Sequence, residues 1–528
     1  MEYIANREEM QKIDAYNIEV LGIPGIVLME RASLTVADEI SSRFPPGSRI
    51  QVLVERGNNG GDGLAAGRIL LARGYRVSFY EIGAVPSMTD SYRIQRDILD
   101  KLKAEFLDGM PEEDPDVWID ALFGVGLSRE VKGPHRQVIE EVNRRSGYVV
   151  SVDLPSGVDA GNGKIRGVAV RADLTVTFGL SKAGLLLYPG ADYAGQVLIK
   201  EMGFMPESIR AIGPGMVSFT RQDLSLLPVR KAWSNKGNYG KILLIAGSTN
   251  MAGAALLSGK GAYRSGGGLV RILTAASNRQ ILQTGLPDAI LSTYHDEGFP
   301  DSGREEKGMA SLDQELENAI SWATVIGIGP GLGQSEAAFY CLKKVLSCAK
   351  VPLVIDADGI NLLARGLHED SEVRELYQHY PWGIILTPHP GEMARLTGRS
   401  IREIIDNPLD TVMSLSDEDH VIVLKDARTL VAGAGEEVYI NRSGNEGMAV
   451  GGSGDVLTGI ICGLLAQYGT DPDRQDRRHD LVTAARLGVY CHGLAGDLAA
   501  STGGRRGLMA SDLPDAAAQI MGKKADKD

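Results

Sequence analysis

The sequence predicts an α/β protein of two domains, each built on a mostly parallel sheet with helices on both faces. Short runs rich in β-branched residues alternate with amphipathic stretches over most of the chain, as expected for parallel strands joined by helices. Many of these runs end in Gly, Pro or Asp, and 65 of the 528 residues are glycine. A chain of this length exceeds what a single hydrophobic core usually serves.

Five strands are expected in the amino-terminal part of the chain. They read "RIQVLVERG", "YRVSFYEIG", "DVWIDALFG", "YVVSVDLPSG" and "LTVTFG", at residues 49–57, 75–83, 116–124, 148–157 and 174–179. Helical patterns separate most of these runs, which predicts a doubly wound sheet. The periodicity then lapses over 205–235, where proline, glycine and polar residues dominate. This lapse predicts two domains, residues 1–218 and 219–528.

A second α/β series occupies the carboxy-terminal part of the chain. Its strands are expected at residues 240–248, 269–277, 323–331, 352–359, 382–391 and 420–427. In open α/β sheets the ligand binds beyond the carboxyl ends of the strands. Residues that end a strand are therefore the candidates for chemistry in both domains.

Composition and charge argue against several functional classes. The 55 basic and 68 acidic residues give a net charge of −13, and no basic block indicates nucleic-acid binding. The first residues are acidic and polar, unlike a signal peptide, and no uncharged apolar run reaches the roughly 18 residues of a membrane span. Four cysteines without a CxxC pair indicate a reducing, cytoplasmic location, and the scattered histidines form no zinc pattern.

A glycine-rich loop precedes one aspartate at the start of a predicted helix, in "GMAVGGSGDVLTG" at residues 447–459. The free N–H groups and the positive dipole end of a helix start bind anions, and glycines let the backbone come close to them. Asp455 beside such a site is suited to act as general base for a hydroxyl that attacks a phosphoryl group. The alternative is a helix N-cap, for which Asp is a favoured residue. No Walker A pattern occurs, so a nucleotide would need a different phosphate cradle.

Several further motifs accompany this loop in the carboxy-terminal part. They are "AGSTNMAGAALLSGKGAYRSGGGLV", "GIGPGLG", "DADGINLL", "LTPHPGEMARL" and "VLKDARTLV". The first four of these motifs, with the glycine-rich loop, make residues from about 235 to 520 resemble the ribokinase-like superfamily and, within it, the nucleotide-dependent NAD(P)H-hydrate dehydratases. One departure is Ser453, where many members have Thr, and it keeps the hydroxyl group.

The resemblance implies roles for single residues of this part. Asp455 would be the acid/base residue at the hydroxyl of the hydrate. The hydrated nicotinamide would be lined by Ala254, Gly331, His389 and Asp455, although His389 taken alone is better explained as a solvated loop histidine. The adenine nucleotide, with Mg²⁺, would be contacted by Lys425, Asp426, Ala427, Arg428, Thr429 and Gly454.

A similar loop, "GNNGGDG" at residues 57–63, follows the first strand of the amino-terminal part and opens a helix. Such a turn suits phosphate or ribose, but a glycine-rich βα turn is often purely structural. Asn59, Asp120 and Ser156 end or follow strands and offer only oxygen ligands, which favour a hard cation. For Asp120 alone, a turn or helix cap is the competing interpretation.

The motifs "GIPGIVLMERAS", "GNNGGDGLAAGRIL", "DALFGVGL" and "DLPSGVDA" make residues 1 to about 215 resemble the NAD(P)H-hydrate epimerases, with a Rossmann-like sheet. The resemblance implies potassium held by Asn59, Asp120 and Ser156. It implies substrate contacts from Asn58, Asn59, Gly60, Gly61, Asp62, Gly124, Val125, Gly126, Leu127, Ser128, Arg129, Glu130 and Asp153. Asp153, at a strand end, would be the catalytic acid/base. Arg56 stands where a small residue is usual, which leaves the shape of the loop open.

Together the two modules resemble the bifunctional NAD(P)H-hydrate repair enzymes over nearly the whole chain. Such an enzyme acts on NADH-hydrate and NADPH-hydrate: one domain interconverts the two stereoisomers, and the other dehydrates the S form at the expense of a nucleotide. The fused arrangement resembles bacterial and archaeal members, which favours ADP over ATP as the donor, giving AMP and phosphate.

Two rival functions stay open at this stage. The carboxy-terminal domain fits a plain small-molecule kinase, whose phosphorylated product would be stable. The amino-terminal domain fits a non-catalytic scaffold, although Asn59, Asp120 and Asp153 argue for a working site. Exposed sheet and helix faces lead us to expect a homo-oligomer.

Overall fold

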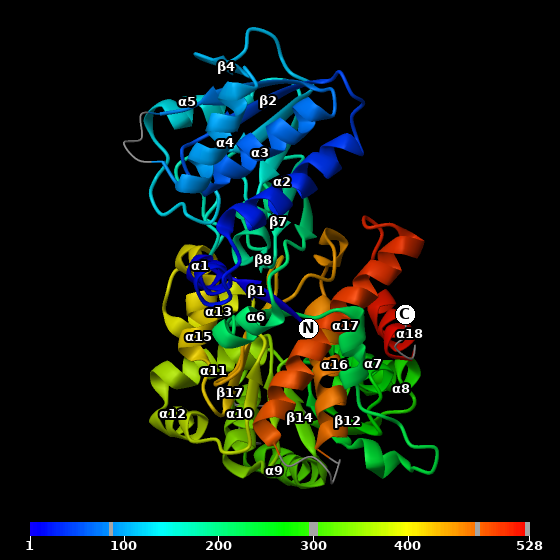
Figure 1. Cartoon of the computed structure of the whole chain (residues 1–528). Helices are drawn as coiled ribbons and strands as arrows, with labels where there is room; N and C mark the ends of the chain where they lie inside the picture. The colour runs from blue at the N-terminus through cyan, green and yellow to red at the C-terminus, as the bar shows by residue number, and fades with distance from the viewer. Residues whose placement is uncertain (84–87, 295–304, 470–475, 523–528) are drawn as a thin grey trace. The chain divides into compact units, whose positions relative to one another are not determined.

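The computed structural model describes residues 1–83, 88–294, 305–469 and 476–522. The chain forms two compact units (Figure 1), each described here by itself. The amino-terminal unit is Tyr3–Met216, and the carboxy-terminal unit combines Met1–Glu2 with Val217–Asp528. The sequence predicts this boundary between residues 218 and 219. Each unit holds a mostly parallel sheet with helices packed on it, so the predicted α/β fold class is confirmed.

The sheet of the amino-terminal unit has the strand order β4-β3-β2-β5-β6-β7-β9, and all its pairs are parallel. The five predicted strands are present, each ending before its predicted end, while β4 and β9 were not foreseen. Outside this seven-stranded sheet, β1 pairs in parallel with β8, with Ala5 opposite Lys182. The strands are β1 Glu2–Ala5, β2 Arg49–Val54, β3 Arg76–Glu81, β4 Glu105–Leu107, β5 Val117–Ala121, β6 Tyr148–Val152, β7 Leu174–Phe178, β8 Ser181–Lys182 and β9 Gln196–Lys200.

Helices cover both faces of this sheet because alternate side chains of each strand point to opposite sides. One apolar core joins Ile50 and Val52 to α2, α3 and α4, and another joins Leu53 and Trp118 to α5. The α-helices are α1 Arg7–Ala15, α2 Gly25–Ser41, α3 Asn58–Ala72, α4 Asp90–Lys101, α5 Gly133–Val142 and α6 Pro206–Ile212. Shorter turns are the π-helix η1 Tyr16–Val20 and the 3₁₀ turns η2 Ala183–Leu185 and η3 Gly190–Asp192.

In the carboxy-terminal unit the strands run in the order β13-β12-β11-β14-β15-β16-β17-β18-β19. Pairs from β13 to β17 are parallel, and β17-β18-β19 are antiparallel. The six predicted strands are present; β13, β18 and β19 were not foreseen. The strands are β10 Met216–Ser218, β11 Lys241–Ile245, β12 Leu269–Ala275, β13 Ile290–Tyr294, β14 Val325–Ile328, β15 Leu353–Ile355, β16 Ile384–Leu386, β17 His420–Leu424, β18 Leu430–Ala432 and β19 Val438–Ile440.

Two groups of helices pack on this second sheet (Figure 1). One group contributes to the main apolar core: α7 Ala252–Arg264, α16 Ser453–Tyr468, α17 Arg477–Gly503 and α18 Leu513–Gly522. The other group is α9 Glu305–Trp322, α10 Glu336–Cys348, α11 Asp358–Glu369, α12 Ser371–Gln378 and α13 Pro390–Thr397. Completing the unit are α8 Arg279–Gly285, α14 Ile401–Asp406, α15 Pro408–Leu415 and the 3₁₀ turns η4 Arg221–Leu226, η5 Lys236–Tyr239, η6 Ala276–Asn278, η7 Glu446–Met448 and η8 Ala510–Asp512.

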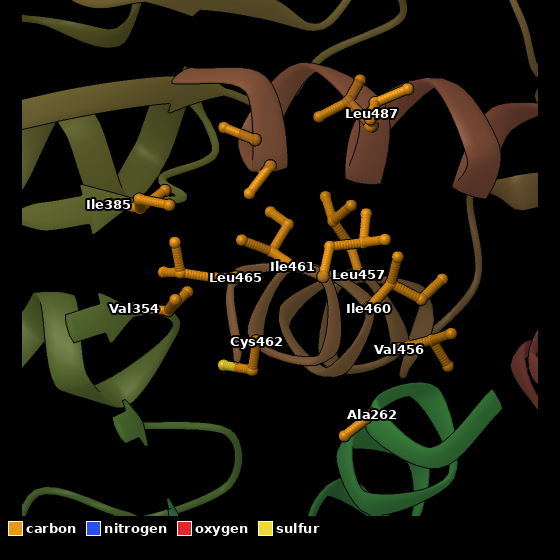
Figure 2. Close-up of a cluster of buried hydrophobic side chains, with 14 of the residues drawn as sticks. Ala262, Val354, Ile385, Val456, Leu457, Ile460, Ile461, Cys462, Leu465 and Leu487 are labelled. Atoms are coloured by element: carbon orange, nitrogen blue, oxygen red, sulfur yellow. The ribbon is translucent and has the colours of Figure 1, made fainter. Parts of the chain in front are cut away.

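Helix α16 is buried along almost its whole length, which fits its uniformly apolar sequence. Figure 2 shows its side chains between Ala262 of α7, Leu487 of α17 and strand residues that include Val354. Glycines bring α16 and α7 close together: a Cβ built on Gly459 would lie 2.0 Å from the carbonyl oxygen of Ser258. The position of the first residues of α16 is therefore set by tight packing.

In the described ranges, no helix combines the length and the apolar character needed to cross a membrane.

Candidate functional sites

The amino-terminal unit has a cavity of about 550 Å³ at the carboxyl ends of its strands. Glu55 follows β2, Leu122 follows β5, and Asp153 follows β6; all three line it. This is the edge at which a doubly wound sheet binds its ligand. The sequence prediction that chemistry gathers at strand ends therefore agrees with the geometry of this unit.

Asp153 sits in the left-handed backbone region, with φ +68°, which is rare for a residue with a side chain. Its Oδ1 accepts hydrogen bonds from Lys182 Nζ at 2.7 Å and Thr177 Oγ1 at 3.1 Å. Its Oδ2 accepts one from the backbone N–H of Val125 at 3.3 Å. The strained turn thus aims a strongly hydrogen-bonded carboxylate at the cavity.

Sequence reasoning missed Lys182, which is 1% exposed. Its Nζ donates to Asp153, to Thr177 Oγ1 at 2.8 Å and to the carbonyl oxygen of Phe178 at 2.8 Å. All three ammonium protons have acceptors, so the lysine is held rigidly. The only signal for Lys182 in the sequence is that it stands in an apolar stretch. This signal does not identify Asp153 as its ion-pair partner.

Two further carboxyl groups line the same cavity. Burial is the main cause that raises the pKa of Asp14 to about 7, and the Lys182 charge opposes it. Burial, together with the charges of Asp153 and Asp14, raises the pKa of Asp62 well above its usual range. Asp62 belongs to the predicted substrate loop, whereas Asp14 was not singled out.

Two of the three predicted cation ligands, Asp120 and Ser156, are joined by hydrogen bonds. Asp120 is fully buried; its Oδ1 accepts from Ser156 Oγ at 2.5 Å and its Oδ2 from Ser151 Oγ at 2.8 Å. Burial raises the pKa of Asp120, and these hydrogen bonds oppose the rise. The third, Asn59, lies beside Gly124, since a Cβ on Gly124 would be 2.9 Å from Asn59 Oδ1. Within the described part of the chain, Asn59 Nδ2 is buried and has no hydrogen-bond partner.

Most of the predicted substrate residues line the cavity, but not all. The lining includes Asn58, Asn59, Asp62, Gly124, Val125, Gly126, Leu127, Ser128, Arg129 and Asp153. Gly60 and Gly61 instead let α3 start against β2 and α2, since a Cβ on Gly60 would overlap the Glu55 carbonyl. Glu130 is exposed and pairs with Lys132 at 2.8 Å. Arg56, the departure noted in the sequence, pairs with Glu81 of β3.

In the carboxy-terminal unit the glycine-rich loop leads into α16. Gly452 has φ +94°, a conformation that favours glycine. The first helical residue, Ser453, is held from α17 by His492, whose Nε2 lies 3.0 Å from the Ser453 carbonyl oxygen and 3.3 Å from its Oγ. Burial lowers the pKa of His492 to about 4, so at neutral pH it is an uncharged donor to that carbonyl.

Asp455 follows in the first turn of α16. Burial is the main cause that raises its pKa to about 7, and the charge of Asp356 adds to it. Lys425 opposes this rise, while Asp358 and Glu392 reinforce it weakly. A carboxyl group with such a pKa exchanges protons readily near neutral pH, which is the property of a general base.

Asp356 fixes the neighbourhood of Asp455. It follows β15, is 1% exposed, and its Oδ1 accepts from Lys425 Nζ at 2.6 Å. Its Oδ2 accepts from Thr458 Oγ1 on α16, also at 2.6 Å. The next residue, Ala357, has φ +50°. The strand end therefore joins the end of β17 to the first turns of α16 through one buried carboxylate.

His389, predicted on the substrate side, is the N-cap of α13. Its Nδ1 accepts from the backbone N–H of Gly391 at 2.9 Å, and its Nε2 lies 3.2 Å from Glu392 Oε1. The ring is half-exposed. Elsewhere at this sheet edge Ala254 and Gly331 lie against each other, since a Cβ on Gly331 would be 2.7 Å from Ala254 Cβ.

The predicted nucleotide residues 425–429 form the turn between β17 and β18. Ala427 N–H donates to Asp426 Oδ1 at 2.7 Å, and Thr429 Oγ1 donates to the Asp426 carbonyl at 3.4 Å. The Nε of Arg428 is buried without a hydrogen-bond partner in the described ranges. Gly454 lies next to Lys425, because a Cβ there would be 3.2 Å from Lys425 Nζ.

Two family models match the chain. The model described as NAD(P)H-hydrate dehydratase matches residues 242–519, and the model described as YjeF-related protein N-terminus matches residues 25–184. The matches fall in the two units separately. They cover every predicted site residue of both units.

Curated relatives align over nearly the whole chain. The bifunctional NAD(P)H-hydrate repair enzyme Nnr of Thermofilum pendens is 36% identical, covering 97% of this chain and 94% of the relative. The enzyme of the same name from Escherichia coli is 34% identical, covering 94% and 89%. Among solved structures, the ADP/ATP-dependent NAD(P)H-hydrate dehydratase of Bacillus subtilis is 30% identical, covering 57% of this chain and 96% of that one, with a TM-score of 0.44. The chain belongs to the family of bifunctional NAD(P)H-hydrate repair enzymes.

Proposed function

We propose that the two units carry out successive steps in the repair of hydrated nicotinamide cofactors. The amino-terminal unit interconverts the R and S forms of NADH-hydrate and NADPH-hydrate. The carboxy-terminal unit dehydrates the S form to NADH or NADPH, with ADP converted to AMP and phosphate. The observation that carries this division is that each family model falls within one unit, on its own cluster of strand-end carboxylates.

In the dehydration step, Asp455 removes the proton of the hydroxyl group at C6 of the hydrated ring. The hydroxyl oxygen then attacks the terminal phosphoryl group of the nucleotide, and the bond to the leaving nucleotide breaks. Loss of phosphate from C6 and of a proton from C5 restores the double bond. The pKa of Asp455, about 7, supports its role as a base that works at neutral pH.

The anion-binding start of α16 supports binding of the transferred group. The N–H groups at a helix start and the glycine loop stabilise negative charge as it develops. Lys425, Asp426, Ala427, Arg428 and Thr429 would hold the nucleotide with Gly454, and the unpaired Nε of Arg428 favours an anionic ligand. Ala254, Gly331 and His389 would line the nicotinamide.

Mg²⁺ would enter with the nucleotide. It is usually held by phosphate oxygens, water and one or two carboxylates rather than by a cage of protein ligands. This fits the unit, since the described residues contain no cluster of three metal-ligating His, Cys, Asp or Glu side chains. Asp358 and Glu392, whose charges raise the pKa of Asp455, are the carboxylates that would ligate the Mg²⁺.

Potassium would be held by Asn59, Asp120 and Ser156 in the amino-terminal unit. The donor set fits, because Asp120 is fully buried and, within the described ranges, accepts hydrogen bonds from uncharged groups of Ser151, Ser156 and Leu122. A buried carboxylate without a countercharge favours a cation nearby. The bound ion would supply a fixed positive charge beside the hydrate.

In the epimerisation step, Asp153 transfers a proton at the C6 hydroxyl of the hydrate. The residues Asn58 to Asp62 and Gly124 to Glu130 would surround the substrate, with Gly60, Gly61 and Glu130 acting through the backbone or the rim. The ion pair with Lys182 supports this role, since it fixes the direction of the carboxylate. A homo-oligomer stays a prediction, supported by exposed apolar side chains such as Val20 and Val27.

The test is to incubate the protein with a mixture of NADPH-hydrate isomers and with ADP or ATP in turn. The proposal predicts complete conversion to NADPH with release of free phosphate, and faster turnover with ADP. A stable phosphorylated product would instead identify a plain kinase. Conversion of only the S isomer at the enzymatic rate would identify the amino-terminal unit as a non-catalytic scaffold.

A further inference from the structure

The segment before α2 contributes to the epimerase cavity, although it lies outside the family-model match at residues 25–184. Met10, Gln11 and Asp14, all on α1, line the cavity. Pairing of β1 with β8 sets Ala5 opposite Lys182, and a capping box at Asn6 starts α1 directly afterwards. The pairing of β1 with β8, which holds Lys182 in place, therefore also sets the position of α1 and of Asp14 on it.

Asp14 shares its surroundings with the groups already placed in the site. It interacts electrostatically with Lys182 of β8 and with Asp153 after β6, and Asp62 of α3 interacts with it in turn. Glu55 and Arg129 are the other charged side chains of the lining. The elements packed on α1 are η1 and α6; Glu19 of η1 is exposed, and Glu207 and Arg210 of α6 pair with each other at 3.1 Å.

Epimerisation at C6 needs two proton-transfer groups. The hydroxyl of the hydrate must lose a proton, and the ring nitrogen N1 must gain one if the ring opens. Asp153 has both oxygens engaged by Lys182, Thr177 and Val125, and every ammonium proton of Lys182 already has an acceptor. Asp153 already takes the hydroxyl proton in this step, and the ammonium of Lys182 is committed to its three acceptors, so a different group must serve N1.

We propose that Asp14 is a second catalytic residue of the epimerase, which donates a proton to ring nitrogen N1 of the hydrate as the ring opens and takes it back on closure. The inference rests on the proposed epimerase activity of this unit. Asp14 is the cavity carboxyl whose pKa, about 7, lets it both give and accept a proton at neutral pH. Asp62, whose pKa burial raises well above its usual range, lines the same cavity from α3.

The step balances without any added reactant. Asp153 takes the proton of the C6 hydroxyl, the C6–O bond becomes a carbonyl, and the C6–N1 bond breaks with its electron pair moving to N1. N1 takes the proton of Asp14. Rotation about the C5–C6 bond then presents the other face of the carbonyl. On closure N1 returns its proton to Asp14 and attacks C6, and the oxygen takes back the proton held by Asp153.

The test compares Asp14→Asn with Glu8→Gln, which removes a charge from an exposed position of the same helix outside the cavity. Interconversion of purified R and S NADPH-hydrate is followed by chromatography without nucleotide. We expect kcat to fall about 100-fold in Asp14→Asn, with KM for the hydrate little changed, and Glu8→Gln to match the wild type. The limb of the wild-type pH profile near pH 7 should vanish in Asp14→Asn.

Asp14→Glu, which keeps a carboxyl group, should recover part of the lost rate and the pH limb. Each variant is also assayed for dehydration of the S isomer by its carboxy-terminal unit. An unchanged rate shows that the protein sample is intact. Interconversion by Asp14→Asn within threefold of the wild type, or a loss confined to KM, would overturn the inference. A loss of kcat that Asp14→Glu does not recover would also overturn it in favour of a structural role. Wild-type protein that does not speed interconversion would instead refute the proposed epimerase function itself.

Discussion

The two units each hold a lysine and an aspartate at the carboxyl edge of a sheet, but they pair them differently. In the amino-terminal unit Lys182 binds Asp153, the proposed catalytic residue, at 2.7 Å. In the carboxy-terminal unit Lys425 binds Asp356 at 2.6 Å. Asp455, the proposed base, is left beside a second carboxylate, and burial together with that charge raises its pKa to about 7.

This difference separates two ways of preparing a carboxyl group for proton transfer. Direct pairing with an ammonium fixes the direction in which the carboxylate points. Burial next to other carboxylates brings the pKa close to neutral, so the group changes its protonation state during a cycle. The same two residue types thus serve two chemistries, and which aspartate the lysine takes decides between them.

The largest expected effect is on Asp455. In Asp455→Asn, dehydration of the S isomer should fall about 10²–10⁴-fold because the base that activates the hydroxyl is lost. Nucleotide should still bind. NADPH absorbance measures dehydration, and interconversion of isomers by the other unit is the internal control. Near-normal turnover would reduce Asp455 to a helix cap.

Asp153→Ala should affect the other activity, the interconversion of the isomers. It should stop interconversion of the isomers and leave dehydration of the S form intact, because that site lies in the other unit. With a mixture of isomers, the S form should disappear quickly and the R form only at the spontaneous rate. Chromatography that resolves the isomers over time checks this. Conversion of the whole mixture at the wild-type rate would contradict the assignment.

The two lysines should differ in their contribution to stability. Lys182→Met leaves a buried carboxylate without its countercharge, which typically lowers the free energy of unfolding by about 3–5 kcal/mol. Lys425→Met should lower it more, because the carboxylate it leaves unpaired, Asp356, is 1% exposed against 11% for Asp153. Calorimetry of the two variants measures both losses. Equal losses would mean that burial does not distinguish the pairs.

The charge of Asp356 should set the pH dependence of dehydration. Asp455 acts as a base only when deprotonated, so the wild-type rate should rise as the pH passes through about 7. Asp356→Asn removes a negative charge that raises this pKa and also frees Lys425, so the pKa of Asp455 falls. The acid limb should move to lower pH by on the order of one unit. A pH–rate profile of the variant tests the sign, and an unmoved limb would rule out the coupling.

The smallest effect concerns the backbone, since both sites place a residue with a side chain in the left-handed region, Asp153 at φ +68° and Ala357 at φ +50°. Ala357→Gly keeps all side-chain chemistry and should raise the free energy of unfolding by on the order of 1 kcal/mol, because relief of strain exceeds the added entropy of the unfolded chain. Ala364→Gly, inside α11, is the control and should lower it. Urea unfolding compares the two.

The sequence predicted the parts of each site that lie in one continuous motif. Strand ends, the glycine loops and the aspartates that follow them have local signals, so Asp153 and Asp455 were named. The predicted K⁺ and substrate assignments stay predictions. What the structure adds are pairs of residues far apart in the chain.

The missed residues show why these pairs escaped. Lys182 and Asp153 are 29 positions apart, and Lys425 and Asp356 are 69 apart. No spacing rule links such positions, because the sheet order brings them together. Asp356 lay within the motif "DADGINLL", which carried the resemblance but gave this residue no role. The short strand β8 carries too few residues for a periodic signal, so Lys182 had no predicted element to sit on.

The burial of α16 should slow the exchange of its backbone amide hydrogens for deuterium in heavy water. Its residues pack against α7, α17 and the sheet, and at Gly459 its backbone is in close contact with α7. Such amides exchange only when the whole unit unfolds. The N–H groups at the first turn of α16 should therefore take up deuterium faster than the rest of the helix, which would distinguish the turn proposed to bind the nucleotide from the buried turns that anchor it.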